Sequence, residues 1–172
     1  TFLNKNGVKS RSILGWQIPI ITDNKFSQAR IERINTEKIL KLFKKFNVLV
    51  VAGFQGISSE GRITTLGRGG SDTTAVAIAA QVGASRCDIY TDVDGIFTTD
   101  PKVVSNAKKL DSITMEEMLE LAGQGAKVIQ TRAVEFANKY NVPVRVLSSF
   151  NKGKGTLITL EEDSMENALV SG

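Results

Sequence analysis

A glycine-rich turn that leads into an almost entirely apolar helix constrains this chain more than any other feature. The turn is 65–75 (TLGRGGSDTTA), and we expect a helix from Ser71 to Val82 that is apolar nearly all round. Such a helix has no wet face, so it must be buried inside a larger fold. Its start offers N–H groups and the positive end of the helix dipole, and glycines let a ligand approach the backbone. The turn therefore predicts an anion site at the end of a core helix.

The residue types of this turn favour a carboxylate or a phosphate as the anion. The guanidinium of Arg68 is a planar fork that can hold a carboxylate through two parallel hydrogen bonds. The Lys-Ser/Thr pair of the Walker phosphate loop does not follow at the required spacing. Two simpler readings stay open: Ser71 and Asp72 as ordinary helix caps, and Arg68 as a surface ion pair of little energetic weight.

A second motif, 90–102 (YTDVDGIFTTDPK), places acidic and hydroxyl residues after a short strand at 88–91. In open parallel sheets, ligands bind beyond the carboxyl ends of the strands. Asp92, Asp94 and Asp100 are candidate Mg²⁺ ligands. Their alternative role is to cap the turns at the glycine and the proline of this motif.

The remaining pattern predicts strands that alternate with helices, which indicates an α/β fold with a mainly parallel sheet. The apolar run 47–54 (NVLVVAGF) predicts a strand buried on both faces, and 55–66 predicts a hairpin. Asn35 is the expected N-cap of a helix through Phe46 whose inward face is Ile39, Leu42, Phe43 and Phe46. A capping box, Thr114-x-x-Glu117, opens another helix. Further elements are expected at 12–16, 18–22, 29–34, 126–140 (a helix with Tyr140 on its inward face), 144–147 and 156–159.

Composition excludes several classes of function. The 172 residues include no histidine and one cysteine, so neither a Ser-His-Asp nor a Cys-His centre can form within them. Cys87 is expected to be a small buried residue in a reducing, cytoplasmic compartment. The apolar runs are too short to span a membrane. The net charge is +4, and its densest cluster, Lys38, Lys41, Lys44 and Lys45, has the spacing of a solvated helix face more than of a nucleic-acid patch.

Three segments in order, 54–75 (FQGISSEGRITTLGRGGSDTTA), 90–101 (YTDVDGIFTTDP) and 116–128 (EEMLELAGQGAKV), resemble the catalytic domain of the aspartate kinase family. The segments GWQIPIITD and RVLSSF resemble it too, and the likeness runs from about Gly15 to Ile158. This resemblance implies the amino-acid-kinase fold, a three-layer α/β/α sandwich. It also implies ATP- and Mg²⁺-dependent phosphorylation of L-aspartate to 4-phospho-L-aspartate, the first step toward lysine, threonine and methionine, in a cytoplasmic enzyme that tends to dimerise and binds neither nucleic acid nor membrane.

The resemblance also assigns residues. The substrate would contact Arg68, Gly69, Gly70 and Ser71, with Arg68 and Asp72 at the transfer centre and no side chain assigned to a metal. ATP would contact Thr91, Asp92, Phe97, Thr98, Thr99, Asp100, Pro101, Lys102 and Lys127.

The chain departs from the family pattern at several places. Phe97 stands where the family often has tyrosine, Lys102 replaces an arginine and so loses a bidentate contact, and Gln130-Thr131 replaces His-Pro. The family's Lys-Phe-Gly-Gly-Thr-Ser segment is not found. We therefore expect 1–160 to be a partial catalytic domain without its N-terminal part, made up of the end of an amino-acid-binding lobe and a nucleotide-binding lobe. We expect 161–172 to be a linker leading toward an absent ACT regulatory region, and the chain alone to be inactive. The alternatives are a non-catalytic ligand-binding or interaction fragment, or a kinase for glutamate, acetylglutamate or a nucleoside monophosphate.

Overall fold

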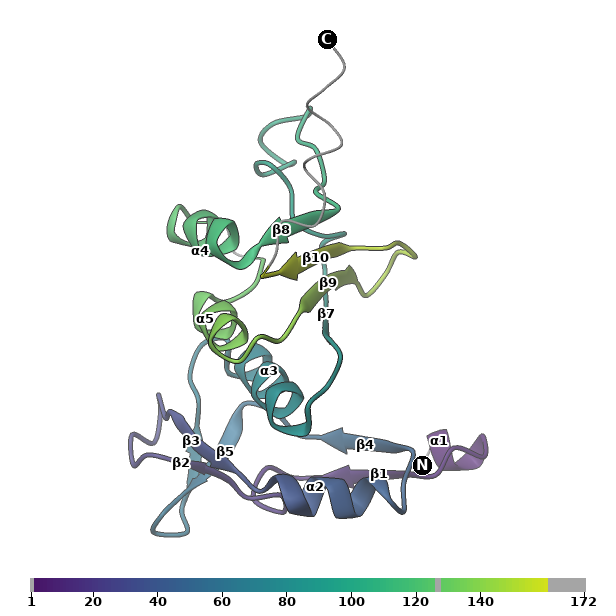
Figure 1. Ribbon diagram of the computed structural model, residues 1–172, viewed down its shortest axis with the longest axis vertical. Helices are drawn as coiled ribbons and strands as arrows, with labels where there is room; N and C mark the ends of the chain where they lie inside the picture. Colours follow the sequence, from purple (N-terminus) through teal and green to yellow (C-terminus); the bar gives the residue numbers. More distant parts are fainter. Residues whose placement is uncertain (1, 126–127, 161–172) are drawn as a thin grey trace. The chain divides into compact units, whose positions relative to one another are not determined.

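The computed structural model describes residues 2–125 and 128–160, and the chain divides into two compact units, Thr1–Gly83 and Ala84–Gly172 (Figure 1). Strands and helices alternate in both, which confirms the α/β class. Among the described strands, four pairs are parallel and three are antiparallel. The assignment of 161–172 as a linker falls outside the described residues.

The first unit contains two small sheets. One pairs β1 (Ser10–Ile13) with β4 (Val48–Val51) in parallel. The other has the strand order β3 (Ile31–Ile34), β2 (Ile20–Thr22), β5 (Gln55–Ser58) and β6 (Ile63–Thr65). The antiparallel β5–β6 pair confirms the predicted hairpin. A four-residue helix, α1 (Phe2–Lys5), was not predicted.

Strand β4 is not buried on both faces, so that prediction is wrong. Its residues are half-buried to exposed, and Val50 is 51% exposed. Within the described part of the chain, β4 pairs only with β1, and this two-stranded sheet leaves one edge of β4 and part of its surface uncovered. A continuous apolar run indicates that a strand is apolar, but it does not show whether other elements cover both of its faces.

Two helices complete the first unit. Helix α2 (Thr36–Phe43) begins after Asn35, whose side chain accepts a hydrogen bond from the Lys38 N–H, as predicted. It ends three residues before Phe46, and Phe43 is 46% exposed, so its expected inward role is wrong. Helix α3 (Gly70–Val82) packs against α2 and is largely buried, as its apolar sequence requires. Its buried residues are Gly70, Thr73, Thr74, Val76, Ala77 and Ala79.

The second unit is built on a four-stranded sheet with the order β7 (Cys87–Thr91), β9 (Val144–Ser148), β10 (Thr156–Thr159) and β8 (Ser112–Thr114). Strands β7 and β9 are parallel, and their last residues, Thr91 and Ser148, are register partners. Alternate side chains of β9 and β10, including Val144, Val146 and Ile158, form the core. Cys87 is buried, as expected.

Helices α4 (Met115–Gly123) and α5 (Thr131–Lys139) pack against each other in the second unit (Figure 1). The capping box at α4 is confirmed: Thr114 Oγ1 accepts from the Glu117 N–H, and the Glu117 carboxylate accepts from the Thr114 N–H. Helix α5 begins at Thr131, later than the predicted 126, because Gln130 is extended and forms its N-cap. Tyr140 lies beyond its end and is 42% exposed, so its predicted inward position is wrong. None of the helices in the described ranges has the length and apolar character needed to cross a bilayer.

Candidate active site

The glycine-rich turn forms the start of α3, and its glycines allow backbone conformations and contacts that other residues would not. Gly67 and Gly69 both have a positive φ, 74° and 68°, a conformation that glycine adopts without steric cost. Gly69 is the N-cap, and the helix begins at Gly70. Ser71 and Asp72 therefore lie in the first turn, and the alternative that they are ordinary helix caps is wrong.

Gly69, as a glycine at the N-cap position, makes no side-chain cap hydrogen bond. The Gly70 N–H turns back onto the loop and donates to the Gly67 carbonyl at 3.0 Å. Thr73 closes the first turn, because its N–H and its hydroxyl both donate to the Gly69 carbonyl at 3.0 Å. The first turn of α3 thus has the backbone geometry that binds anions at helix starts.

Gly70 is a point of very close approach. A Cβ at this position would lie 2.8 Å from Leu66 Cβ and 2.9 Å from Phe54 Cδ2, distances that real Cβ atoms essentially never show. The ring of Phe54 therefore lies directly against the first residue of α3. Any larger residue at position 70 would push this ring or the β6–α3 loop away.

Phe54 is held in a conformation that bulky residues rarely adopt, with φ 69°. Three hydrogen bonds surround it. Its N–H donates to Thr74 Oγ1 at 3.1 Å, its carbonyl accepts from the Leu66 N–H at 3.0 Å, and Thr74 Oγ1 donates to the Gly70 carbonyl at 2.6 Å. Sequence reasoning missed both Phe54 and Thr74. The signal was present, because Phe54 follows the carboxyl end of a parallel strand, where ligand sites occur.

The charged and hydroxyl residues of the turn lie at its surface. Arg68 and Ser71 are exposed, and Asp72 is half-buried. Ser71 Oγ is 3.5 Å from an Asp72 carboxylate oxygen, at the outer limit of a hydrogen bond. A guanidinium beside the start of a helix is suited to holding a carboxylate by charge-assisted hydrogen bonds.

The second motif begins where β7 ends in the second unit. The Thr91 carbonyl accepts from the Ser149 N–H at 2.7 Å, and the Thr91 hydroxyl donates to Asp92 at 3.2 Å. The side-chain oxygen of Ser148, the register partner of Thr91, accepts hydrogen bonds from the backbone N–H groups of Phe150 and Asn151. The ends of β7 and β9 are thus joined by hydrogen bonds, and we call the polar residues Thr91, Asp92 and 148–151 the strand-end rim.

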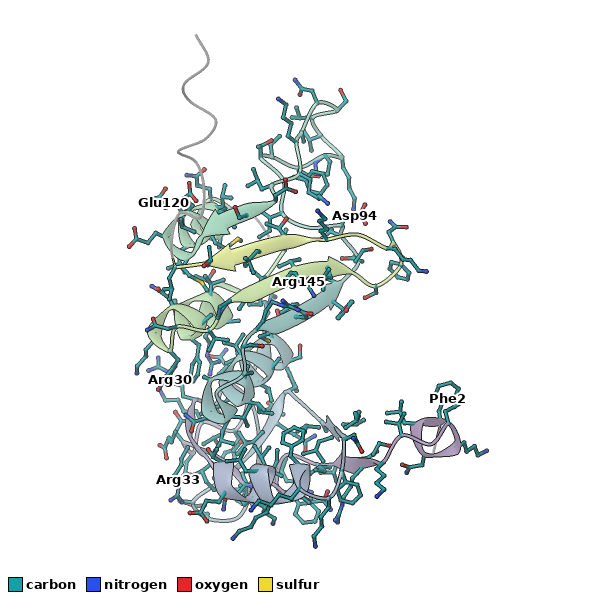
Figure 2. The ribbon with its side chains drawn as sticks, turned by 45° about the vertical axis from the view of Figure 1, so that its right-hand side comes forward. Phe2, Arg30, Arg33, Asp94, Glu120 and Arg145 are labelled. Carbon is teal, nitrogen blue, oxygen red and sulfur yellow. The ribbon has the colours of Figure 1, made fainter. Side chains whose placement is uncertain are left out.

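Asp94 ties this rim together, which Figure 2 shows beside the loop between β9 and β10. Its carboxylate accepts from the Asn151 side-chain amide at 2.9 Å. The pKa of Asp94 is lowered, first by this hydrogen bond, then by one from the Ser148 hydroxyl, with the Lys109 charge adding to them. The carboxylate is held ionised by loop contacts, and it does not cap the turn at Gly95.

A buried threonine anchors the base of the second motif. Thr156 is fully buried, and its hydroxyl accepts from the Ile96 N–H at 2.9 Å and donates to the Leu110 carbonyl at 2.6 Å. A Cβ on Gly95 would lie 2.6 Å from this hydroxyl oxygen, and Gly95 has φ 147°. This glycine is therefore required by the contact and by the backbone.

The loop beyond is exposed. Phe97 bridges to Lys109, and Thr98 exchanges hydrogen bonds with Lys108. The Asp100 carboxylate accepts a hydrogen bond from the Lys102 N–H at 2.8 Å. Asp100 therefore caps the turn at Pro101, which was the alternative to a role as a Mg²⁺ ligand. Four residues of this loop that were predicted to contact ATP are exposed: Thr98, Thr99, Pro101 and Lys102.

The candidate Mg²⁺ ligands Asp92, Asp94 and Asp100 do not gather into a metal site. Within 2–125 and 128–160, no three acidic or sulfur side chains come together in a way that could hold a metal ion. Lys127, the last predicted nucleotide contact, lies outside the described residues. The Arg68 group belongs to the first unit, and the Thr91 group belongs to the second.

A cavity of about 320 Å³ lies elsewhere in the second unit, at the start of α4. It contains none of the predicted site residues. Its lining residues are Thr114, Met115, Glu116, Glu117, Glu120, Asn138 and Leu160.

Comparison with known proteins identifies the family of the chain. The model of the amino acid kinase family matches residues 1–148. The chain belongs to the amino acid kinase family. Among relatives of this family, the aspartate kinase of Pseudomonas fluorescens is 60% identical over 99% of the chain, and the aspartokinase of Pseudomonas aeruginosa is 58% identical over 99%. The chain spans 41% and 42% of the lengths of these two relatives.

Solved structures of amino acid kinases agree. E. coli aspartokinase III in complex with aspartate and ADP matches 94% of the chain, and 37% of its own length, with a TM-score of 0.82 and 36% identity. The aspartate kinase of Synechocystis matches 92% of the chain, and 26% of its own length, with a TM-score of 0.77 and 43% identity. UMP kinase from Bacillus anthracis, at 21% identity and a TM-score of 0.62, shares the fold alone.

Proposed function

We propose that this chain is the part of an aspartate kinase that binds L-aspartate and ATP, and that the reaction is phosphorylation of the β-carboxylate of L-aspartate. The observation that carries the proposal is the end-to-end likeness to aspartate kinases, which reaches 60% identity over 99% of the chain. The start of α3, with glycine at its N-cap and Arg68 beside it, supports an acidic acceptor, because a helix start and a guanidinium both favour a carboxylate.

In this proposal the two units have different tasks. Thr1–Gly83 carries the amino-acid residues Arg68, Gly69, Gly70 and Ser71, and Ala84–Gly172 carries the nucleotide residues of the second motif and Lys127. The expected partial catalytic domain at 1–160 would then contain one unit that binds the amino acid and one that binds the nucleotide.

The proposed chemistry needs little covalent help from the protein. A β-carboxylate oxygen of aspartate attacks the γ-phosphorus of ATP, the bond to the bridging oxygen of ADP breaks, and the products are 4-phospho-L-aspartate and ADP. Catalysis of such a transfer comes from positioning and from stabilising charge. Arg68 and the α3 backbone hold the acceptor carboxylates, and Asp72 in the first turn organises the groups around the transfer centre.

In this proposal Mg²⁺ would arrive bound to the phosphates of the nucleotide. It commonly binds through one or two carboxylates together with substrate phosphates, and the three aspartates of the second motif form no separate metal site among the described residues. We assign it no side chain here. When bound, it would neutralise charge on the phosphates.

The setting of the enzyme follows from the same proposal. The product would supply lysine, threonine and methionine biosynthesis, the compartment would be the ATP-containing cytoplasm, and the intact enzyme would be a homodimer.

The test is an acceptor comparison with the intact protein, MgATP, and L-aspartate, L-glutamate or UMP, followed by ADP release and by trapping of the acyl phosphate with hydroxylamine. We expect turnover with aspartate and at least 100-fold less with the other two. Turnover with glutamate or UMP in preference to aspartate would reject the proposal in favour of a related kinase. Binding of both ligands with no turnover would favour a non-catalytic binding protein.

A further inference from the structure

We propose that Thr74 is a positioning residue for the acidic substrate, acting through Phe54 and Gly70. The inference rests on the proposed function, and it concerns a residue of the 65–75 turn to which the resemblance assigned no role. Thr74 lies one turn inside α3 and is 1% exposed, so it cannot touch a ligand at the helix start directly.

The Thr74 hydroxyl joins two segments that are far apart in sequence. It accepts from the Phe54 N–H at 3.1 Å and donates to the Gly70 carbonyl at 2.6 Å. One oxygen therefore fixes the loop after β4 to the first residue of α3. A hydroxyl that donates to the carbonyl four residues earlier is common in helices, but here the same oxygen also receives a bond from another element.

The loop needs such a restraint, because Phe54 has φ 69°. Sparsely populated backbone conformations of this kind persist only where surrounding contacts determine them, and they cluster at ligand sites. The second restraint on Phe54 is the bond from the Leu66 N–H to its carbonyl, which comes from the segment leading into the glycine-rich turn. Both restraints therefore originate in the β6–α3 segment that carries Arg68.

The side chain of Phe54 transmits this restraint to the site. Its ring lies against Gly70, where an added Cβ would be 2.9 Å from Cδ2, and the residue is 44% exposed. The ring thus forms a partly open wall at the start of α3. Without the Thr74 hydroxyl, the Phe54 N–H loses its partner and the backbone can relax from the positive φ, which moves this wall.

The test compares Thr74→Val, which replaces the hydroxyl by a methyl group of similar shape, with Thr74→Ser, which keeps the hydroxyl. Measured in the intact protein, Thr74→Val should raise KM and Kd for aspartate about tenfold and change KM for MgATP less than twofold. Thr74→Ser should stay within threefold of wild type for aspartate.

Thr22→Val is the matched control. Thr22 is also 1% exposed in the same unit, and its hydroxyl lies 2.7 Å from that of Thr64 on β6 and donates to the Asp23 carbonyl at 3.0 Å. It should lower Tm without changing aspartate affinity. The inference is overturned if Thr22→Val weakens aspartate as much as Thr74→Val does, or if Thr74→Val affects both substrates equally.

Phe54→Gly keeps the inference testable should Thr74→Val fail to fold, because glycine accepts the positive φ without strain. We expect it to fold and to weaken aspartate selectively, and unchanged aspartate affinity would overturn the inference. A wild-type protein that binds no aspartate would overturn both this inference and the proposed function. Normal aspartate binding by wild type and by Thr74→Val alike would overturn this inference alone.

Discussion

At the scale of single residues, the substrate side of the proposed site depends on one guanidinium and on glycines that admit no side chain. Arg68 is exposed on the turn, whereas Gly70 is buried between Leu66 and Phe54. Substitution of Arg68 should therefore weaken ligand binding, whereas substitution of Gly70 should lower stability.

Arg68→Ala should weaken aspartate binding about 10- to 100-fold, because a hydrogen bond to a charged group contributes about 1.5–3 kcal/mol. The affinity for MgATP should change less than threefold. Calorimetric titration of each ligand measures both quantities. Arg62→Ala is the control, since Arg62 is an exposed arginine that stacks on Phe26 at 4.2 Å. Equal losses of both ligands in Arg68→Ala would contradict the assignment.

Gly70→Ala should lower the free energy of unfolding by about 1–3 kcal/mol, as expected for an overpacked buried position. Urea denaturation measures this change. Gly123→Ala provides the comparison, because nothing lies within 4 Å of a Cβ there and alanine favours helix. We expect that variant to be neutral or slightly more stable. An unperturbed Gly70→Ala would show that the contact with Phe54 adjusts without cost.

Local signals predicted some residues and missed others. Asn35, Thr114 and Gly69–Gly70 were found because caps and glycine turns act through near neighbours in sequence. Phe54 and Thr74 were missed, since the positive φ of one and the double hydrogen bond of the other exist only once β4, β6 and α3 have packed. Capping roles for Ser71 and Asp72 failed for a related reason, because Gly69 took the N-cap position.

At the scale of elements, helix type was predictable and helix extent was less so. The apolar pattern found α3 and the capping box found α4. Helix α5 begins at Thr131 and not at 126, because the extended Gln130 sets its boundary. Strand β4 was found, yet its exposure was not, because burial depends on the layers that cover a strand. A pattern along one segment contains no information about its neighbours.

The capping box of α4 should contribute stability and nothing to catalysis. Thr114→Ala removes the hydroxyl that accepts from the Glu117 N–H, and loss of a cap costs about 0.5–2 kcal/mol. We expect a lower urea midpoint with unchanged KM for both substrates. Thr114→Ser, which keeps the cap, should behave as wild type. A change in KM for ATP in Thr114→Ala would place α4 closer to the chemistry than we propose.

The pair of strands β7 and β9 carries a pH-dependent contact on its face, where Figure 2 shows Arg145. Desolvation alone would raise the pKa of Asp88, but hydrogen bonds from Arg145 at 2.7 Å and Arg86 at 2.6 Å outweigh it, so this pKa is lowered from 3.8. A lowered folded-state pKa means stability that is present above the unfolded value and lost as pH falls through the folded one.

Asp88→Asn should therefore reduce stability at pH 7 and flatten its fall below about pH 4, where the wild-type carboxylate takes up a proton. Thermal unfolding from pH 7 to pH 2 measures both effects. Asp111→Asn, at an exposed position, serves as the charge-matched control. Parallel pH curves for wild type and Asp88→Asn would contradict this account.

At the scale of the whole molecule, the fold class was predictable because strands and helices alternate along the chain. The resemblance implied an amino-acid-binding lobe and a nucleotide-binding lobe within 1–160, but it did not give the boundary between Thr1–Gly83 and Ala84–Gly172, because Gly83 from sequence alone reads only as a helix end. The proposed substrates divide in the same way, with one recognition motif in each unit.

Hydrogen exchange followed by mass spectrometry can test this division in the intact protein. L-aspartate should slow exchange in peptides that cover 53–54 and 67–72, and MgATP should slow exchange in peptides that cover 91–102. Peptides from α2, which carries none of the proposed contacts, provide the internal reference. Protection of the same unit by both ligands would contradict the division of tasks.

The unusual backbone of Phe54 has a consequence for protein engineering. A selection for heat resistance should readily return glycine or asparagine at this position, because both relieve the unfavourable dihedral. Such thermostable clones should be poor catalysts. The wild-type aromatic residue would then mark a place where natural selection has preferred activity over robustness.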